Sequence, residues 1–333
     1  MPRRAAVAIL LLVLLGVGVY LVRKNSGAAK PPTTRVVIAQ AGDFFLYAPL
    51  YVALDANYFK EQHLDASVVT TGGDDKTWAA VISNSAQFGI ADPTFIAASA
   101  QRGQPGKVIA SIVNGVPFWG VTWRADLKPF KNPADLKNLK VATFSAPSTA
   151  YVLQEKMFRD AGLAPNIAQG AFGSLLTMLR SGQADIALEL EPNVSQAAAD
   201  GATILYSMKD VYGDFAITGL TATPRYLQDN QAAVTAVTCA LQKALDLIHS
   251  QPDRVLDILH RRFPDIQEAV ARAALRRVID GGIIPSTLAV SPAAWQKAID
   301  LRISVKDISG PAPFAAFVDN SFADRAAQNC RLR

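Results

Sequence analysis

Residues 45–61 read Phe-Leu-Tyr-Ala-Pro-Leu-Tyr-Val-Ala-Leu-Asp-Ala-Asn-Tyr-Phe-Lys-Glu, and this stretch decides the fold prediction. Two short runs typical of β-strands flank it, residues 36–39 (Val-Val-Ile-Ala) and residues 67–70 (Ser-Val-Val-Thr). Pro49 suits the first turn of a helix, because its missing N–H leaves no hydrogen bond unmade there. The segment therefore predicts a strand, a helix and a second strand in succession.

The same alternation continues along the chain. Short apolar runs predict strands at residues 36–40, 66–71, 87–91, 107–113, 119–123, 140–144, 184–188, 203–207 and 216–223. Helical patterns predict helices at residues 47–57, 75–83, 93–101, 148–161, 173–181, 230–249, 252–262, 266–280 and 291–302. Such alternation argues for parallel sheets covered by helices on both faces. We therefore expect an α/β protein with about two domains.

Composition indicates a globular protein. Half of the 333 residues are hydrophobic and 18% are charged, so the chain can bury a full core. The net charge is +5, but the basic residues are scattered apart from the pairs Arg261-Arg262 and Arg276-Arg277, which we interpret as solvated helix faces. Because no basic stripe interleaved with aromatic residues is present, the sequence argues against nucleic acid as a partner.

The N-terminal region carries an uninterrupted apolar run at residues 5–22, preceded by Arg3-Arg4 and followed by Arg23-Lys24. The run fits an export signal, and it is almost long enough to span a membrane. No Cys lies near it, which excludes a lipid anchor. An uncleaved inner-membrane anchor and a cleaved signal therefore both stay open, with residues up to 35 completing the signal or anchor and a linker.

Two cysteines, Cys239 and Cys330, are too few for a Cys-based zinc site or an iron–sulfur site. No metal and no cofactor is predicted. Outside the cytosol the two can form a disulfide that ties the C-terminal tail to a helix. The alternative, a buried Cys239 and a free Cys330, stays open because sequence separation does not test the geometry.

Catalytic motifs are absent from the sequence. None of the three histidines is spaced as a metal pair, and neither H-E-x-x-H nor G-x-S-x-G occurs. No glycine-rich phosphate-binding loop follows a strand. These absences favour a binding protein over an enzyme.

Candidate binding residues therefore come from the loops at the carboxyl ends of the predicted strands, because ligands bind at that edge of open α/β sheets. Several of them have a structural alternative as helix caps or core residues. The candidates are Asp43, Phe44, Tyr47, Gly73, Asp74, Asp92, Trp119, Ser145, Ser148, Thr149 and Glu191.

Glu191 is the candidate for which the sequence makes the most specific prediction. It follows a predicted strand, and alternation places it on the same face as Glu189. If the protein closes over this carboxylate and excludes water from it, the carboxylate needs a partner, because burying it unpaired costs several kcal/mol. That partner is either a nitrogen of a ligand or a basic residue of the protein, and both stay open.

Several segments resemble one family, the ABC-transporter substrate-binding proteins for sulfonates, nitrate and thiamine-precursor pyrimidines. The segments that carry the resemblance are residues 48–53, 58–61, 75–80, 89–93, 182–185 and 191–192. The resemblance implies a type II periplasmic-binding-protein fold, in which two lobes of parallel-rich sheet, flanked by helices, enclose a ligand cleft. It also implies a discontinuous first lobe at residues 36–120 and 220–325, a second lobe at residues 125–215, and an N-terminal segment at residues 1–35.

The resemblance further implies a role at the periplasm or cell surface, delivering a small solute to an ABC permease and its ATPase. A related pyrimidine-forming enzyme carries a His after the third strand, where this chain has Asp92-Pro93-Thr94, so we expect no enzyme activity. That enzyme places a carboxylate at the position of Glu191, which favours a nitrogenous heterocycle as solute. The alternatives are a membrane-tethered sensor of the same fold and a binding protein for a sulfonate, taurine or nitrate.

Overall fold

The computed structural model describes residues 32–146 and 148–332, and residues 34–333 form one compact unit. The predicted apolar segment at residues 5–22 lies outside the described residues. Within the described part, no helix is both long enough and apolar enough to cross a membrane.

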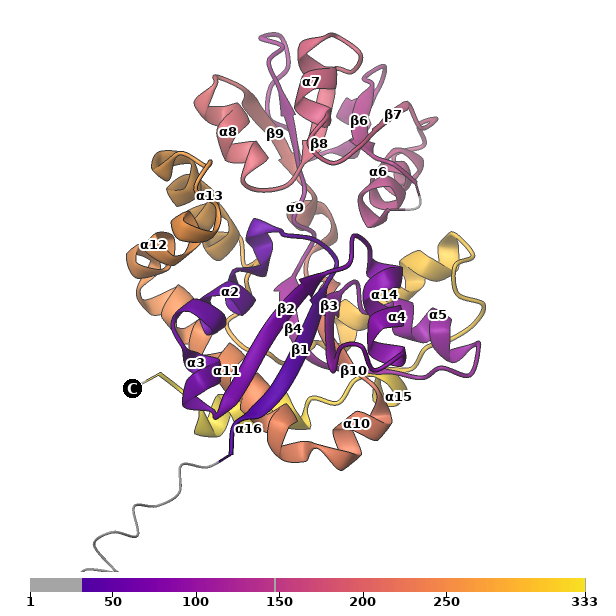
Figure 1. Cartoon of the computed structure of the whole chain (residues 1–333). Helices are drawn as coiled ribbons and strands as arrows, with labels where there is room; N and C mark the ends of the chain where they lie inside the picture. Colours follow the sequence, from indigo (N-terminus) through magenta and orange to yellow (C-terminus); the bar gives the residue numbers. More distant parts are fainter. Residues whose placement is uncertain (1–31, 147, 333) are drawn as a thin grey trace, which may run out of the picture. The chain divides into compact units, whose positions relative to one another are not determined.

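Ten strands form two five-stranded sheets among the described residues (Figure 1). The first sheet has the order β2-β1-β3-β10-β4, and its strands are β1 (Thr34–Gln40), β2 (Leu64–Thr70), β3 (Phe88–Ala91), β4 (Lys107–Asn114) and β10 (Ala216–Ala222). The second has the order β7-β6-β8-β5-β9, and its strands are β5 (Trp119–Thr122), β6 (Val141–Phe144), β7 (Ile167–Gly170), β8 (Ile186–Glu189) and β9 (Thr203–Ser207). All nine predicted strands are present, whereas β7 was not predicted.

Both sheets are mixed, which corrects the expectation of parallel sheets from strand–helix alternation alone. In the first sheet β1 pairs in parallel with β2 and β3, but β10 is antiparallel to β3 and β4. In the second sheet β6 pairs in parallel with β7 and β8, but β5 is antiparallel to β8 and β9. The chain enters the second sheet through β5 and returns to the first through β10. These two strands, each the first after a crossing, run antiparallel to both of their neighbours.

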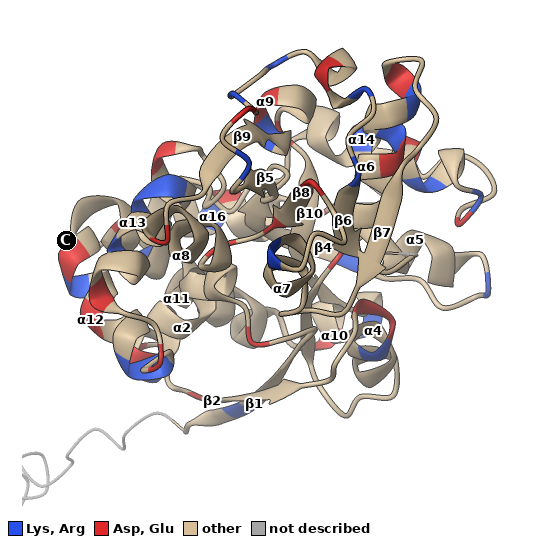
Figure 2. Ribbon diagram, turned by 90° about the horizontal axis from the view of Figure 1, so that it is seen from above, with Lys and Arg blue, Asp and Glu red and all other residues tan. Residues whose placement is uncertain are grey.

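Helices flank both sheets, so that each sheet with its helices forms one lobe (Figure 1; Figure 2 shows the same elements from above). The predicted helices correspond to α2 (Ala48–Asp55), α4 (Asp74–Ile82), α5 (Phe95–Ala100), α6 (Thr149–Asp160), α7 (Leu175–Arg180), α11 (Gln231–Ser250), α12 (Pro252–Arg262), α13 (Glu268–Asp280) and α14 (Pro292–Ser304). Further short helices are η1 (Phe45–Tyr47), α3 (Tyr58–Glu61), η2 (Pro133–Leu136), α8 (Asn193–Ala199), α9 (Met208–Tyr212), α10 (Pro224–Asp229), α15 (Phe314–Phe317) and α16 (Ser321–Asn329). The exact lobe boundaries at residues 36–120, 125–215 and 220–325 stay predictions.

Two of the predicted helices, α2 and α6, start with the chemistry expected from their sequences. Pro49 lies in the first turn of α2, and the side chain of Ser148 caps α6 by accepting a hydrogen bond from the Tyr151 amide at 3.2 Å. The start of α4 differs, because its N-cap is Gly73 rather than an aspartate, and Asp74 and Asp75 lie inside its first turn. There they favour the helix through its dipole instead of through a side-chain cap.

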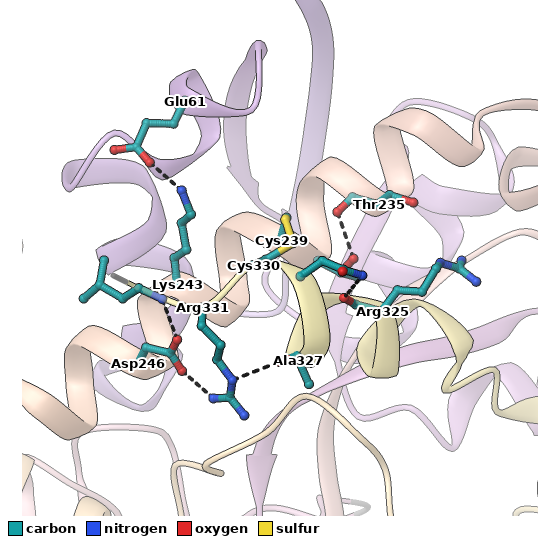
Figure 3. The surroundings of a disulfide bond; sticks show 12 residues. Glu61, Thr235, Cys239, Lys243, Asp246, Arg325, Ala327, Cys330 and Arg331 are labelled. Atoms are coloured by element: carbon teal, nitrogen blue, oxygen red, sulfur yellow. Dashed lines mark hydrogen bonds and ion pairs between the residues drawn. A yellow bond between two sulfur atoms is a disulfide. The ribbon is translucent and has the colours of Figure 1, made fainter.

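A disulfide joins Cys239 of α11 to Cys330 at the end of α16, which settles the pairing that the sequence left open (Figure 3). Asp246, also on α11, accepts hydrogen bonds from Arg331 at 2.6 Å and from the amide of Leu332 at 2.8 Å. On the same helix, Lys243 forms an ion pair with Glu61 of α3. The helix α11 thus holds the C-terminal tail on one side and the segment around α3 on the other.

Candidate ligand-binding site

The carboxyl ends of β3 and β6 face each other across the two lobes, and a three-residue group connects them. Asp92 follows β3 of the first sheet, and Thr149 begins α6, the helix after β6 of the second sheet. The Thr149 hydroxyl donates a hydrogen bond to Asp92 Oδ2 at 3.0 Å. Arg302 of α14 donates from Nη2 to both, at 2.6 Å to Asp92 and 2.8 Å to Thr149. The predicted candidates Asp92 and Thr149 are therefore brought together, by an arginine that was not predicted.

Arg302 is almost fully buried, with 6% of its side chain exposed. Its Nε also donates to the Thr94 hydroxyl at 3.2 Å, and its Nη1 lies 3.1 Å from Asp307. A guanidinium in this setting is held by carboxylates and hydroxyls on several sides, as its fixed fork geometry allows. Sequence reasoning gave no signal for it, because it lies 210 residues from Asp92 and beyond the part of the chain that carries the family resemblance.

Asp74 lies beside this group. Its Oδ1 accepts a hydrogen bond from the Asp92 amide at 2.9 Å. Burial and, to a smaller extent, the nearby Asp92 carboxylate together raise the pKa of Asp74 to about 6, since like charges disfavour ionisation. Tyr47, another candidate, is buried next to these acids, and burial raises the pKa of its phenol well above the usual range.

Aromatic side chains bridge the lobes at a second place. Phe44 of the first lobe contacts Phe172 of the second with ring centroids 5.3 Å apart, and Tyr47 lies edge-on to Phe44 at 5.4 Å. Phe172 stacks on Phe144, the last residue of β6, at 5.7 Å. Phe172 is 58% exposed although its ring contacts both Phe44 and Phe144. The prediction that aromatic residues around 44–47 gather at the site thus gains a partner from the other lobe.

Glu191 has an internal basic partner, one of the two alternatives left by the sequence. Arg277 of α13 donates from Nε to Glu191 Oε1 at 2.5 Å, and Ser195 donates to both carboxylate oxygens, from its hydroxyl at 2.9 Å and its amide at 3.0 Å. Glu191 is fully buried, and burial raises its pKa although Ser195 and Arg277 oppose that shift. The strand β8 ends at Glu189, so strand alternation does not extend to Glu191.

Glu189 is buried at the same edge with fewer partners. Its Oε2 accepts hydrogen bonds from the Leu190 amide at 3.3 Å and from Asn193 Nδ2 at 3.2 Å. Its Oε1 has no hydrogen-bond partner among the described residues. The candidate Trp119 is its register partner in β5, so the two side chains point to the same face of the sheet. Burial raises the pKa of Glu189 to about 7.

The remaining candidates lie apart from these contacts. Asp43 bonds with Gln40, Thr70 and Arg262; burial alone would raise its pKa, but the bonds from Arg262 and Gln40 lower it. Gly73 accepts hydrogen bonds through its carbonyl from the Thr71 and Thr77 hydroxyls, and Ser145 is exposed. The described residues contain no group of three or more His, Cys, Asp or Glu that could hold a metal ion.

Replacing Glu189 with Gln is expected to stabilise the protein at alkaline pH only. Its folded-state pKa of about 7 lies above the ordinary 4.5, so the stability that Glu189 contributes is full below pH 4.5 and is lost as the pH rises through 7. The change in unfolding free energy caused by Glu189→Gln should therefore become more favourable by about 3 kcal/mol between pH 4.5 and pH 8. Urea unfolding at both pH values measures it, with Glu155→Gln on α6 as the control; equal changes at both pH values would contradict the prediction.

Comparison with known proteins identifies the family. The family model described as NMT1/THI5 like matches residues 45–255. This chain belongs to the NMT1/THI5-like family. The binding protein YtlA of Bacillus subtilis is 26% identical over 295 residues, which cover 84% of this chain and 85% of YtlA.

Solved structures of the same fold confirm the two-lobe, type II architecture of this NMT1/THI5-like chain. The alkanesulfonate-binding protein SsuA of Xanthomonas axonopodis, bound to MOPS, has a TM-score of 0.67 at 19% identity, covering 88% of this chain and 99% of SsuA. The periplasmic nitrate-binding protein NrtA of Synechocystis has a TM-score of 0.67 at 14% identity, covering 90% of each chain. The named relatives are binding proteins rather than enzymes.

Proposed function

We propose that this protein is an extracytoplasmic solute-binding protein that delivers a small solute to an ABC importer. The observation that carries the proposal is the group of Asp92, Thr149 and Arg302, in which the carboxyl ends of strands from two lobes meet. Clefts of this kind close on a solute by movement of one lobe against the other. The relatives named above are binding proteins for an alkanesulfonate and for nitrate, which supports a small solute in general.

The acidic character of the site favours a nitrogenous solute over an anion. Four carboxylates lie at these strand ends, and among the described residues two arginines bond to them. The carboxylates are those of Asp74, Asp92, Glu189 and Glu191, and the arginines are Arg277 and Arg302. Both arginines already bind carboxylates of the protein, whereas a sulfonate or nitrate would require unengaged donors. We therefore propose a nitrogenous heterocycle as solute, with a sulfonate, taurine or nitrate as the alternative.

A thermal-shift panel tests this function. The protein is mixed with aminopyrimidines, riboflavin-like heterocycles, taurine, alkanesulfonates and nitrate, each at high concentration. A solute present at 100 times its dissociation constant stabilises the folded state by about 2.7 kcal/mol, which raises the melting temperature measurably. We expect a shift with a nitrogenous heterocycle. A shift only with sulfonates or nitrate would reverse the choice of solute, and no shift with any compound would refute solute binding.

A membrane-tethered sensor is the second candidate, favoured by the 18 apolar residues at positions 5–22 and by the absence of a nearby Cys. The two functions differ in one observable. Deleting the gene abolishes uptake of the identified solute if the protein serves an importer, and leaves uptake unchanged if it is a sensor.

A further inference from the structure

We propose that Glu189 is the residue that determines solute specificity, with its Oε1 accepting a hydrogen bond from an N–H of the bound solute. This inference rests on the proposed solute-binding function and names the group that would read the solute. Four observations carry it: the open hydrogen-bonding capacity of the carboxylate, its burial, its place at the edge of the sheet, and the engagement of the neighbouring carboxylates by the protein.

The hydrogen bonds of the Glu189 carboxylate are unevenly distributed. Both protein donors, the Leu190 amide and Asn193, reach Oε2, and Oε1 has none among the described residues. A buried acceptor without a hydrogen bond costs about 1–3 kcal/mol of folding free energy, so such an atom calls for a functional explanation. A solute N–H that reached Oε1 would satisfy it, while Asn193 would hold the carboxylate in place through Oε2.

Glu189 lies in the second lobe, at the edge that faces the first lobe. It is the last residue of β8, which runs parallel to β6. The last residue of β6, Phe144, stacks on Phe172, which in turn contacts Phe44 of the first lobe. Two residues beyond Glu189, the bond between Glu191 and Arg277 also crosses between the lobes. The carboxyl end of β8 therefore lies at the edge where the lobes meet; because Glu189 is fully buried, a solute would reach it only when the lobes part.

Two of the other carboxylates at the strand ends, Glu191 and Asp92, are engaged by the protein through both oxygens. Both oxygens of Glu191 accept bonds from Ser195, and Oε1 also binds Arg277. Both oxygens of Asp92 accept bonds, from Thr94 at Oδ1 and from Thr149 and Arg302 at Oδ2. Glu189 differs from both because its hydrogen-bond donors among the described residues, the Leu190 amide and Asn193, are neutral; its carboxylate therefore suits a neutral or cationic nitrogen donor and repels an anion.

The experiment compares 4-aminopyrimidine with 4-(dimethylamino)pyrimidine, which keeps the ring but has no N–H. Isothermal titration at pH 8 measures both probes against the wild type, Glu189→Gln and the control Glu155→Gln. We expect the wild type to bind the dimethylated probe at least 10-fold more weakly than the parent. Glu189→Gln should weaken binding of the parent about 10-fold to 100-fold, the range of a hydrogen bond to a charged group, and should leave the dimethylated probe unchanged. Glu155→Gln should change neither.

A second readout follows protons instead of affinity. Accepting a solute N–H favours the ionised carboxylate, so the proton exchange that accompanies binding of 4-aminopyrimidine near pH 6.5 should differ between the wild type and Glu189→Gln. Titrations in two buffers of different ionisation enthalpy measure this exchange for both proteins. Equal binding of both probes by the wild type, or unchanged affinity in Glu189→Gln, would overturn the role of Glu189. If taurine, methanesulfonate or nitrate binds and neither pyrimidine does, solute binding stands and this inference fails; if none of these probes binds, both fail.

Discussion

Replacing Arg302 with Met is expected to lower the free energy of unfolding by about 3–5 kcal/mol, the cost of breaking a buried ion pair by removing one partner. Arg302 donates to Asp92 at 2.6 Å and to Thr149 at 2.8 Å, and only 6% of its side chain is exposed. Met fills a similar volume without the charge. The variant therefore leaves the Asp92 carboxylate buried without its cation, and it removes the hydrogen bond from Arg302 to Thr149 of the other lobe.

Urea unfolding at pH 7 measures the loss, and Arg225→Met provides the matched control. Arg225 forms an ion pair with Asp229 on α10, but 89% of its side chain is exposed, so its loss should cost less than about 1 kcal/mol. Adding Asp92→Asn to Arg302→Met should recover part of the stability, because the unpaired charge is then gone. A loss in Arg302→Met no larger than in the control would show that the buried pair does not stabilise the fold.

The strands were predictable because most of them are apolar runs bounded by turn residues. The first-sheet strands β3 (Phe-Gly-Ile-Ala) and β10 (Ala-Ile-Thr-Gly-Leu-Thr-Ala) are buried at every position, and neither contains a charged residue or a strict polar–apolar alternation. The strand β7 was missed because it lies at an edge of the second sheet and buries none of its residues fully. Its sequence, Ile-Ala-Gln-Gly, carries neither a long apolar run nor a polar–apolar alternation.

The site was predictable only at the strand ends. Asp92 and Thr149 follow strands of different sheets, and ligands bind at the carboxyl ends of such strands, so each could be chosen as a candidate although their mutual contact could not be derived from the strands alone. Their common partner Arg302, and Arg277 beside Glu191, lie on C-terminal helices whose docking the helical pattern does not specify. Arg277 was interpreted as part of a solvated helix face, yet it reaches a fully buried carboxylate. Partners brought together by tertiary packing leave no local signal in the sequence.

Replacing both Cys239 and Cys330 with Ala is expected to lower the free energy of unfolding by about 4–5 kcal/mol under oxidising conditions. The two residues are 91 positions apart, so the disulfide closes a long loop in the unfolded chain. In the chain-entropy model a loop of that length restricts the unfolded state by about this amount. The double variant keeps the hydrogen bonds from Arg331 and the Leu332 amide to Asp246, so the measurement isolates the cross-link.

Urea unfolding with and without a reductant tests this expectation on the wild type and the double variant. Reduction should destabilise the wild type to the level of the variant and leave the variant unchanged. Arg331→Met, which removes the ion pair with Asp246 at a side chain 48% exposed, serves as the control and should cost less than about 1 kcal/mol. If the double variant lost no more than this control, the tail would be held by its hydrogen bonds and by the packing of α16 on α11, and the disulfide would contribute little to stability.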